Sequence, residues 1–292
     1  MESNYDSMMT ASFLPYRMGY LTDWMVKKAE EELNETDEIR AHSLTELRKL
    51  IAKEKNLDVW TDNSYLLQFL RARKFDSDRA MELIRCLYTI LKDNPDIFPK
   101  KLDTDKAISV FETNVGGAFP YRHSDGGVIA FINIANWNPD QIPIQLAISA
   151  VTAMLLSLVE DPATQVCGVH IVYDAQYKMN HLRAVSLRYI KFFSKLLRNM
   201  LPVRFNSVHI VNESPIFRYL FNMLKIFLSE KIRNRFHFHG SDMKQLHQYL
   251  PKEILPPEYG GDNINYSASE FCIKEFSPFV KKYSEMHRKG YF

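Results

Sequence analysis

Residues 207–240, SVHIVNESPIFRYLFNMLKIFLSEKIRNRFHFHG, contain two strand patterns that flank a long apolar helical pattern. The segments 207–212 and 235–240 contain the β-branched and aromatic residues that are typical of strands. Ser214 and Pro215 follow the first of them, and a hydroxyl before a proline is a common start of a helix. A strand, a helix and a strand in this order predict a parallel β–α–β unit.

Two further strand patterns precede this unit, VIAFINIA at 128–135 and GVHIVYD at 168–174. Helical patterns at 141–160, 183–201 and 215–234 separate the four strands. This alternation predicts an α/β fold with a mainly parallel sheet and right-handed crossovers. Residues 142–159 approach the length of a membrane-spanning helix, but Gln145 and several small residues favour a helix buried inside the domain.

The N-terminal third has helical patterns and no strand pattern. We expect helices over 37–55, in the stretch YLLQFLRARKF that follows residues 62–64, and from Asp76 and Ser77 to the residues before Pro95. The predicted organisation is therefore an all-α module at 36–100, an α/β domain at 101–265 and a short C-terminal helix within 266–292. Residues 1–35 show no clear period, so no order is predicted for them.

Composition excludes several classes of protein. The chain has 292 residues, of which 46% are apolar and 25% charged, as in ordinary globular proteins. A net charge of only +2 argues against nucleic-acid binding. The three cysteines lie far apart, so no disulfide framework or zinc knuckle is expected and a reducing compartment is favoured. The start MESNYDSMMTASF lacks the pattern of a secretory signal. We expect a cytoplasmic monomer.

The helix at 215–230 has an unusually wide apolar face. Its polar residues form one narrow stripe of Arg218, Asn222, Lys225 and Ser229. A surface helix needs an apolar stripe of little more than about 100°. Two interpretations remain open: either most sides are buried, or one face closes a cavity and the other meets lipid. The apolar positions that form the predicted gate are Ile216, Phe217, Leu220, Phe221, Met223, Leu224, Phe227 and Leu228.

A continuous helical wheel also separates the cations that follow this helix. Lys231 and Arg235 fall on the side of Phe217 and Leu220, whereas Arg233 extends the polar stripe. Cations beyond an apolar face are typical of helices that lie at an anionic membrane surface.

Sequence motifs for catalysis and metal binding are missing. The chain contains no G-x-S-x-G, no P-loop and no H-E-x-x-H. The segment VGGAFPYRHSDGG lacks G-x-G-x-x-G and precedes a strand. His237 and His239 have no further ligand near them in the sequence. We therefore predict no enzyme activity, no catalytic residue, no cofactor and no metal site.

Three stretches resemble signatures of the CRAL-TRIO lipid-transfer family, in the branch of tocopherol, retinaldehyde and clavesin proteins. They are YLLQFLRARKFDSDRA at 65–80, the stretch from His209 to Gly240, and LPPEYGG at 255–261. The resemblance covers roughly residues 40–275. It implies a hydrophobic cavity between a mixed sheet and helices, with residues 215–234 as a mobile gate, and it implies no reaction.

The resemblance further implies a basic cluster that binds phosphoinositide headgroups. The matching positions are Arg73, Arg204, Lys231 and Arg235. Arg71, Lys74 and Arg233 are nearby candidates that the motif supports less well. The implied membrane ligand is phosphatidylinositol bisphosphate, and the implied location is the surface of endosomal or other phosphoinositide-containing membranes.

Alternation along the strands and helical spacing give candidate cavity residues. They are Phe131, Ala147, Ala150, Val151, Met154, Val169, Ile171, Tyr173, Val185, Phe193, Leu196, Leu197 and Leu201. Ordinary core packing is the alternative for each. The expected cargo is a hydrophobic lipid with one polar end. Tyr173 and the altered segment DAQYKMNHL after the strand depart from the tocopherol-binding pattern, so no particular lipid is favoured. The alternative function is a phosphoinositide-reading adaptor that carries no cargo.

Overall fold

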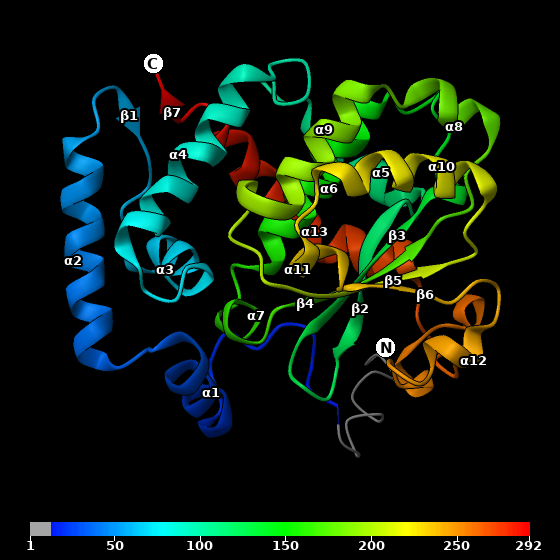
Figure 1. Cartoon of the computed structure of the whole chain (residues 1–292), viewed down its shortest axis with the longest axis horizontal. Helices are drawn as coiled ribbons and strands as arrows, with labels where there is room; N and C mark the ends of the chain where they lie inside the picture. The colour runs from blue at the N-terminus through cyan, green and yellow to red at the C-terminus, as the bar shows by residue number, and fades with distance from the viewer. Residues whose placement is uncertain (1–12) are drawn as a thin grey trace.

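The computed structural model describes residues 13–292, and it places a helical region beside an α/β domain (Figure 1). The helical region contains α1 (Asp23–Leu33), α2 (Asp37–Lys53), α3 (Asn63–Ala72) and α4 (Ser77–Asp93). The carboxylates of Asp62 and Asp76 accept hydrogen bonds from the first turns of α3 and α4 at 2.9 and 3.0 Å. These caps explain why both helices begin where the sequence predicts.

Helix α1 falls in the segment 1–35, for which no order was predicted. Its buried residues Met25, Ala29 and Leu33 are spaced four apart and form one narrow stripe. Because this stripe carries few apolar residues, its period is weak in the sequence. Residues 1–12 of that segment lie outside the described part of the chain.

The central sheet has the strand order β2-β3-β4-β5-β6. The strands are β2 (Gly116–Arg122), β3 (Val128–Asn133), β4 (Val169–Asp174), β5 (Phe205–Val211) and β6 (Phe236–Phe238). Only the β2–β3 pair in this sheet is antiparallel. The predicted α/β fold with a mainly parallel sheet is confirmed. A second, two-stranded sheet pairs β1 (Leu57–Asp58) with β7 (Gly290–Tyr291).

Strand β2 was not predicted, because its glycines reduce strand propensity. They are needed for close packing: a Cβ at Gly117 would lie 2.6 Å from the ring of Phe131 on β3. The glycine-containing segment VGGAFPYRHSDGG is therefore an edge strand and a turn of the sheet.

The helices of the α/β domain are more numerous than the sequence patterns predict. They are α5 (Thr104–Glu112), α6 (Ile144–Leu158), α7 (Pro162–Cys167), α8 (Met179–Ala184), α9 (Leu187–Lys195), the π-helix η3 (Leu196–Met200), α10 (Pro215–Leu224), α11 (Glu230–Arg233), α12 (Met243–Leu246) and α13 (Ala268–Met286). Short 3₁₀ turns are η2 (Ile134–Asn136), η4 (Lys225–Phe227), η5 (Lys252–Ile254) and η6 (Pro257–Tyr259). The predicted helix 183–201 is divided among α8, α9 and η3.

The predicted continuous helix 215–234 is wrong. The α-helix ends at Leu224, and Leu228 is extended, with φ −97° and ψ 139°. The Leu228 side chain is only 5% exposed. Its burial accompanies the change of direction, and Ser229 then starts α11. A single helical wheel consequently does not apply to Lys231 and Arg235, and their side must be taken from the tertiary structure.

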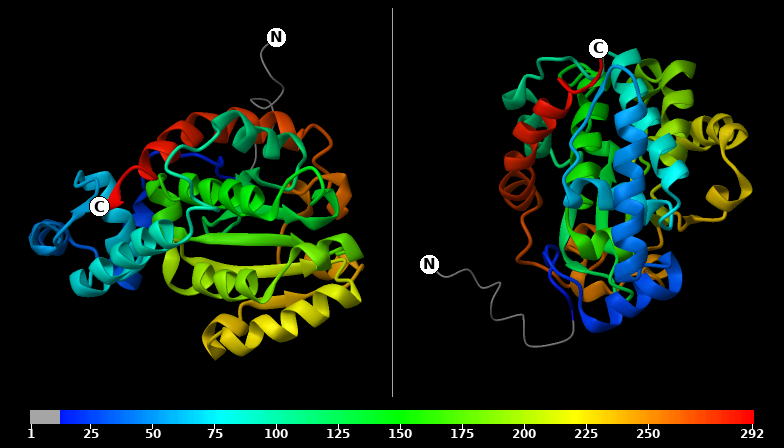
Figure 2. Two further views of the ribbon diagram at one scale, coloured as in Figure 1. Left: turned by 90° about the horizontal axis from the view of Figure 1, so that it is seen from above. Right: turned by 90° about the vertical axis from the view of Figure 1, so that its left-hand side faces the viewer.

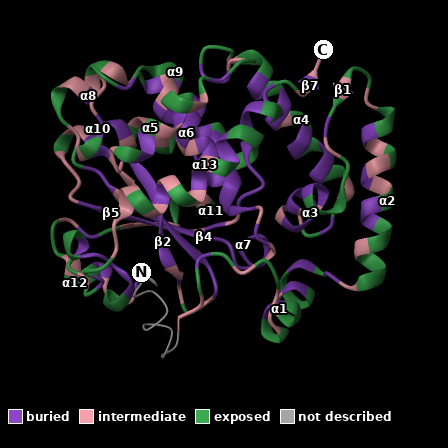
Figure 3. Cartoon of the chain, turned by 180° about the vertical axis from the view of Figure 1, so that it is seen from behind, coloured by how far each residue is buried: buried purple, intermediate pink, exposed green. Residues whose placement is uncertain are grey.

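Helices α10 and α13 lie on opposite sides of the molecule (Figure 2). The C-terminal helix was predicted to be short, but α13 has 19 residues. One of its faces is buried, where Cys272, Phe276, Val280 and Tyr283 contribute to the core (Figure 3). It packs against α5, α6 and β2, so it is part of the α/β domain. Within residues 13–292, no helix combines the length and hydropathy that crossing a bilayer requires.

Candidate functional site: an apolar cavity under a two-faced helix

A cavity lies between one face of the sheet and the helices α6, α9 and α10. Its volume is about 170 Å³. The wall side chains are aliphatic or aromatic: Val115, Ile132, Ile134, Trp137, Ile144, Ala147, Ile148, Val151, Leu155, Ile171, Tyr173, Tyr177, Val185, Ile190, Phe193, Leu196, Leu197, Phe205, Val208, Ile210, Phe217, Leu220, Phe221, Leu224 and Phe236. Such a wall suits an apolar ligand.

Most of the predicted cavity residues lie on this wall. They are Ala147, Val151, Ile171, Tyr173, Val185, Phe193, Leu196 and Leu197. Phe131, Ala150, Met154, Val169 and Leu201 are buried in the core and do not line the cavity. Of the predicted gate residues, Phe217, Leu220, Phe221 and Leu224 line it, whereas Ile216, Met223, Phe227 and Leu228 do not.

Register and helix rotation account for three of these misses, Phe131, Ala150 and Met154. Phe131 pairs with Val172, whereas Ile132 pairs with Tyr173, so Ile132 is the β3 residue that faces the cavity. On α6 the lining residues Ile144, Ile148, Val151 and Leu155 form one stripe. Ala150 and Met154 lie about 100° away from that stripe. The sequence could supply both periods but not their phase relative to the sheet.

Two tyrosines supply the free polar groups of the wall. The hydroxyl oxygens of Tyr173 and Tyr177 are 2.6 Å apart, and burial raises the pKa of Tyr177 to about 12. Each neutral hydroxyl has one proton to donate, and the hydrogen bond between the two hydroxyls uses one of these two protons. The other wall N–H, at Trp137 Nε1, donates to the carbonyl of Ile142 at 2.8 Å. One phenolic proton is therefore left to donate to an oxygen of a ligand.

Helix α10 is apolar on two sides. Its inner face, including Phe217 and Leu220, closes the cavity. On the outer side Tyr219 is 59% exposed, and Ile226 in the following turn is 76% exposed. A wide apolar face was predicted, and the structure shows it divided between the cavity and the molecular surface.

The two ends of this covering segment are attached differently. At the start, Ser214 Oγ accepts hydrogen bonds from the N–H groups of Phe217 and Tyr177, which ties the helix to the loop after β4. At the end, the exposed guanidinium of Arg198 on η3 donates to the carbonyl oxygen of Phe227 at 2.8 Å. The second attachment depends on one exposed side chain, so it is the easier one to break.

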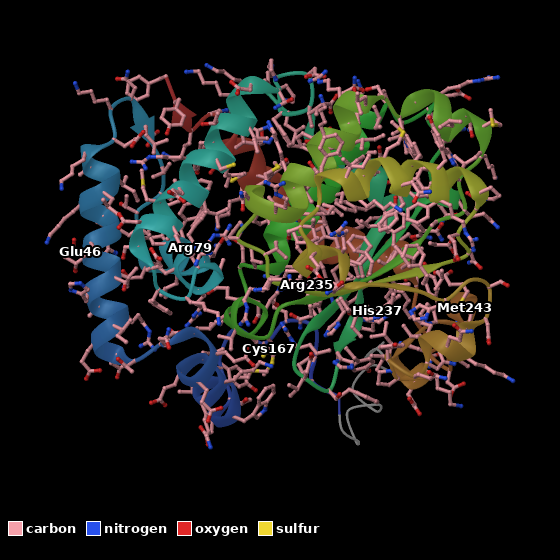
Figure 4. The ribbon with its side chains drawn as sticks, in the orientation of Figure 1. Glu46, Arg79, Cys167, Arg235, His237 and Met243 are labelled. Atoms are coloured by element: carbon pink, nitrogen blue, oxygen red, sulfur yellow. The ribbon has the colours of Figure 1, made fainter. Side chains whose placement is uncertain are left out.

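Two of the predicted headgroup-binding arginines meet at one sheet edge. Arg204 precedes β5 and Arg235 precedes β6, and the starts of parallel neighbours lie at the same edge. Burial lowers the pKa of Arg235, and nearby Arg204 lowers it further. Lys231 is exposed on α11, while Arg204 also pairs with Glu32 at 2.8 Å. Figure 4 marks Arg235 at this edge.

The arginines of the N-terminal module have different surroundings. Arg73 is half-buried, and burial together with nearby Arg79 lowers its pKa. Arg71 is buried and donates to Glu35 at 2.7 and 2.8 Å and to Gln165 at 2.7 Å. This fully engaged side chain removes Arg71 as a headgroup candidate. Lys74 and Arg233 are exposed.

Comparison with known proteins agrees with this architecture. The model of the CRAL/TRIO domain matches residues 113–261. The human "Alpha-tocopherol transfer protein-like" protein is 38% identical over 275 residues, which cover 91% of this chain and 79% of that protein. Mouse Clavesin-2 is 28% identical over 239 residues, covering 81% and 73%. The chain therefore belongs to the CRAL/TRIO family, as the sequence motifs predict.

A solved structure, that of Sfh5, is similar over 91% of this chain and 98% of its own. It shares 14% identity with a TM-score of 0.43, a level at which individual site residues are not comparable.

Proposed function

We propose that this protein binds a small hydrophobic lipid and transfers it between membranes without chemical change. The observation that carries the proposal is the division of α10 into a cavity face and an exposed apolar face. A soluble carrier needs the cavity face to shield its cargo from water. It needs the exposed apolar face to contact a bilayer when cargo enters or leaves.

The gate in this proposal is α10 with η4, residues 215–227, rather than a helix that continues to residue 234. Outward movement of this segment exchanges the cavity contacts of Phe217 and Leu220 for contacts with acyl chains. Because both environments are apolar, the net loss of buried apolar area is small and the barrier to opening is modest. In water the same movement exposes these side chains at a cost of about 25 cal/mol per Å², which keeps the gate closed.

The proposed docking surface is the basic edge next to the gate. Lys231 on α11 and Arg235 before β6 follow the gate in the chain, and Arg204 lies close to Arg235. Arg204 already pairs with Glu32, so anionic headgroups would supply counter-charge chiefly to Lys231 and Arg235. Arg73 contributes from the N-terminal module. The headgroup is a phosphatidylinositol bisphosphate, and the working location is the cytoplasmic surface of membranes that contain it.

The cargo class follows from the tyrosine pair. A ligand that fits an aliphatic wall with one available phenolic proton is a hydrophobic molecule with one oxygen acceptor, such as a hydroxyl, carbonyl or ester. The protein would carry this cargo without reacting with it. The only potential nucleophiles among the wall side chains are the two phenols, whose pKa values are raised.

The second candidate is a phosphoinositide-reading adaptor that carries no cargo. The half-buried basic edge supports this adaptor function, because these cations can bind a headgroup whether or not the cavity holds a lipid. The two functions differ in what the purified protein contains.

Organic-solvent extraction of protein purified from eukaryotic cells, followed by mass spectrometry, tests the proposal. A carrier retains one hydrophobic lipid per chain, and it moves that lipid from donor to acceptor vesicles. Leu220→Asp, which places a charge in the cavity wall, should abolish retention. Lys281→Ala, at an exposed position of the opposite helix α13, changes the net charge by the same amount and is the matched control. An extract without stoichiometric lipid, together with intact vesicle binding, would support the adaptor instead.

A further inference from the structure

The face of the sheet that points away from the cavity carries a row of histidines. His170 alternates with the cavity residues Ile171 and Tyr173 on β4, and His209 alternates with Val208 and Ile210 on β5, so both point to the opposite side. His237 on β6, which Figure 4 labels, and His239 directly after this strand extend the row, and both rings contact Tyr249. The proposed lipid function uses none of these residues.

Two of the histidines share one carboxylate. His123 and Asp125 lie in the turn between β2 and β3, and His170 lies on β4. One oxygen of Asp125 is 2.9 Å from Nδ1 of His123, and the other is 3.0 Å from Nε2 of His170. The potential donor atoms of the three side chains all lie within 4.8 Å of one another. For comparison, ligand atoms in a tetrahedral zinc site with bonds of about 2.0–2.1 Å are about 3.3 Å apart.

The outer nitrogens of both imidazoles are already engaged. Nε2 of His123 lies 3.0 Å from the carbonyl oxygen of Tyr249, to which it can only donate. Nδ1 of His170 lies 2.7 Å from Oγ of Ser207. Metal-binding histidines typically make such an outer hydrogen bond, which fixes the ring and directs the other nitrogen at the metal.

The hydrogen bonds behind His170 are compatible with the tautomer in which Nε2, the nitrogen that faces Asp125, carries no proton. Ser207 Oγ lies 2.7 Å from Nε2 of His209, and Nδ1 of His209 lies 3.0 Å from Nε2 of His239. This chain can donate in either direction with every member neutral, since a hydroxyl both donates and accepts. Burial, with His239 nearby, lowers the pKa of His209 to about 3, so this relay stays neutral.

The carboxylate needs a counter-charge. Its ion-pair contacts are with His123 and His170, which carry charge only when protonated. Each carboxylate oxygen contacts one imidazole nitrogen, and the N–H of Gly127 donates to one of these oxygens at 2.8 Å. The amide of Asn206 also donates toward Asp125 at 3.4 Å while held by the carbonyl of Cys167 at 2.7 Å. When both histidines are neutral, a metal cation would supply the positive charge.

The turn is rigid and open to solvent on one side. The N–H of His123 donates to the Gly127 carbonyl, and the N–H of Gly126 donates to the His123 carbonyl, both at 2.8 Å. The Asp125 side chain is 35% exposed, His123 19% and His170 8%. The Asp125 N–H also lies 3.3 Å from Nδ1 of His123, a long contact that a metal would replace.

We infer that His123, Asp125 and His170 form a binding site for one divalent transition-metal ion of the zinc type. Two imidazoles and a carboxylate, with water in a fourth position, are a suitable ligand set for Zn²⁺ or Co²⁺. The bound ion would join the β2–β3 turn to β4 on the face opposite the lipid cavity. Its role there is structural, and it is independent of the proposed lipid transfer.

Cobalt titration of the full-length, tag-free protein at pH 7.5 tests the site. We expect visible absorption that saturates at one Co²⁺ per chain, is displaced by Zn²⁺, and accompanies proton release. Asp125→Asn and His123→Gln should weaken binding at least tenfold. His237→Gln, on the same sheet face but outside the ligand set, should bind like the wild type. Circular dichroism in EDTA checks that each variant folds, and His123→Gln, in a partly exposed turn, remains informative if Asp125→Asn does not fold.

Unchanged Co²⁺ binding by both ligand variants would overturn the inference. A wild type that binds no Co²⁺ under these conditions would overturn it as well.

Discussion

The phenolic oxygens of Tyr173 and Tyr177 lie 2.6 Å apart on the wall of an otherwise apolar cavity. Phe217 on the covering helix packs against both rings, with centroid separations of 5.6 and 5.8 Å. The polar end of a cargo would therefore meet the tyrosines at the same place where the gate closes. This geometry links recognition of the cargo to the position of α10.

Removing the tyrosine hydroxyls should change which lipids bind. The double variant Tyr173→Phe, Tyr177→Phe should bind a cargo that has an oxygen acceptor about 1 kcal/mol less tightly, or roughly fivefold more weakly. A hydrocarbon probe of similar size should bind equally well to the variant and to the wild type, since it uses only the apolar wall. Fluorescence displacement measures both affinities, and an equal loss for the two probes would show that the rings act only in packing.

The basic edge should control attachment to membranes. Each cation near an anionic surface contributes about 1 kcal/mol, so Lys231→Ala with Arg235→Ala should weaken binding to phosphatidylinositol-bisphosphate vesicles about 30-fold. Lys274→Ala with Lys281→Ala removes the same charge from exposed positions of α13, on the other side of the molecule. Vesicle cosedimentation compares the two pairs. Equal losses would mean that only net charge matters.

The outer face of the gate should insert into the bilayer. Ile226 is 76% exposed, so Ile226→Ser should leave the unfolding free energy nearly unchanged. Loss of its burial in lipid should weaken membrane association by about 1.5 kcal/mol, or roughly tenfold. Binding of a soluble fluorescent cargo serves as the control and should not change. Membrane affinity equal to that of the wild type would indicate that the gate does not enter lipid.

Arg198 should hold the gate closed at its C-terminal end. Arg198→Ala removes the hydrogen bond to the Phe227 carbonyl, which has a net value of about 1 kcal/mol. Hydrogen exchange within 215–228 should become faster, and release of cargo to vesicles should accelerate a few-fold. Lys191→Ala, which removes a cation from an exposed position of the adjoining helix α9, provides the comparison. If both variants exchange at the wild-type rate, the contact does not restrain the gate.

His287 should make stability depend on pH. Burial lowers its pKa from 6.5 to about 4 despite the hydrogen bond to the Pro99 carbonyl, and its Nε2 has no described partner. Between those values the unfolded chain binds the proton and the folded chain does not, so stability falls as the pH decreases from about 6.5 toward 4. The expected loss at pH 5 is roughly 2 kcal/mol.

Urea unfolding at pH 7.5 and pH 5 measures this loss. His287→Gln retains an amide donor for Pro99 but cannot take up the proton, so its stability should change less between the two pH values. An identical acid dependence in the variant and the wild type would assign the effect to other groups, such as His209.

The strand and helix periods near the cavity were visible in the sequence. Alternation in GVHIVYD placed Ile171 and Tyr173 on one face, and the polar stripe of 215–230 showed that α10 has more apolar surface than one interface requires. Both are local properties, because side-chain direction within a strand or helix depends only on spacing. The same is true of the Ser214–Pro215 start of α10.

Other features depended on contacts between distant segments. Helix α10 ends at Leu224, and Leu228 is buried instead of continuing the helix. Arg71 is kept from the surface by its ion pair with Glu35, which is distant in the sequence. Phe131 was placed on the wrong face because register between strands is not encoded within one strand. The residues of the histidine–aspartate site come from a turn and a strand that are adjacent only in the sheet, which is why no sequence spacing indicated it. The sequence by itself thus determined the family and the spacing of apolar residues in each helix and strand. Only the tertiary structure decided which face of each element is turned toward the cavity, since this depends on which surfaces meet.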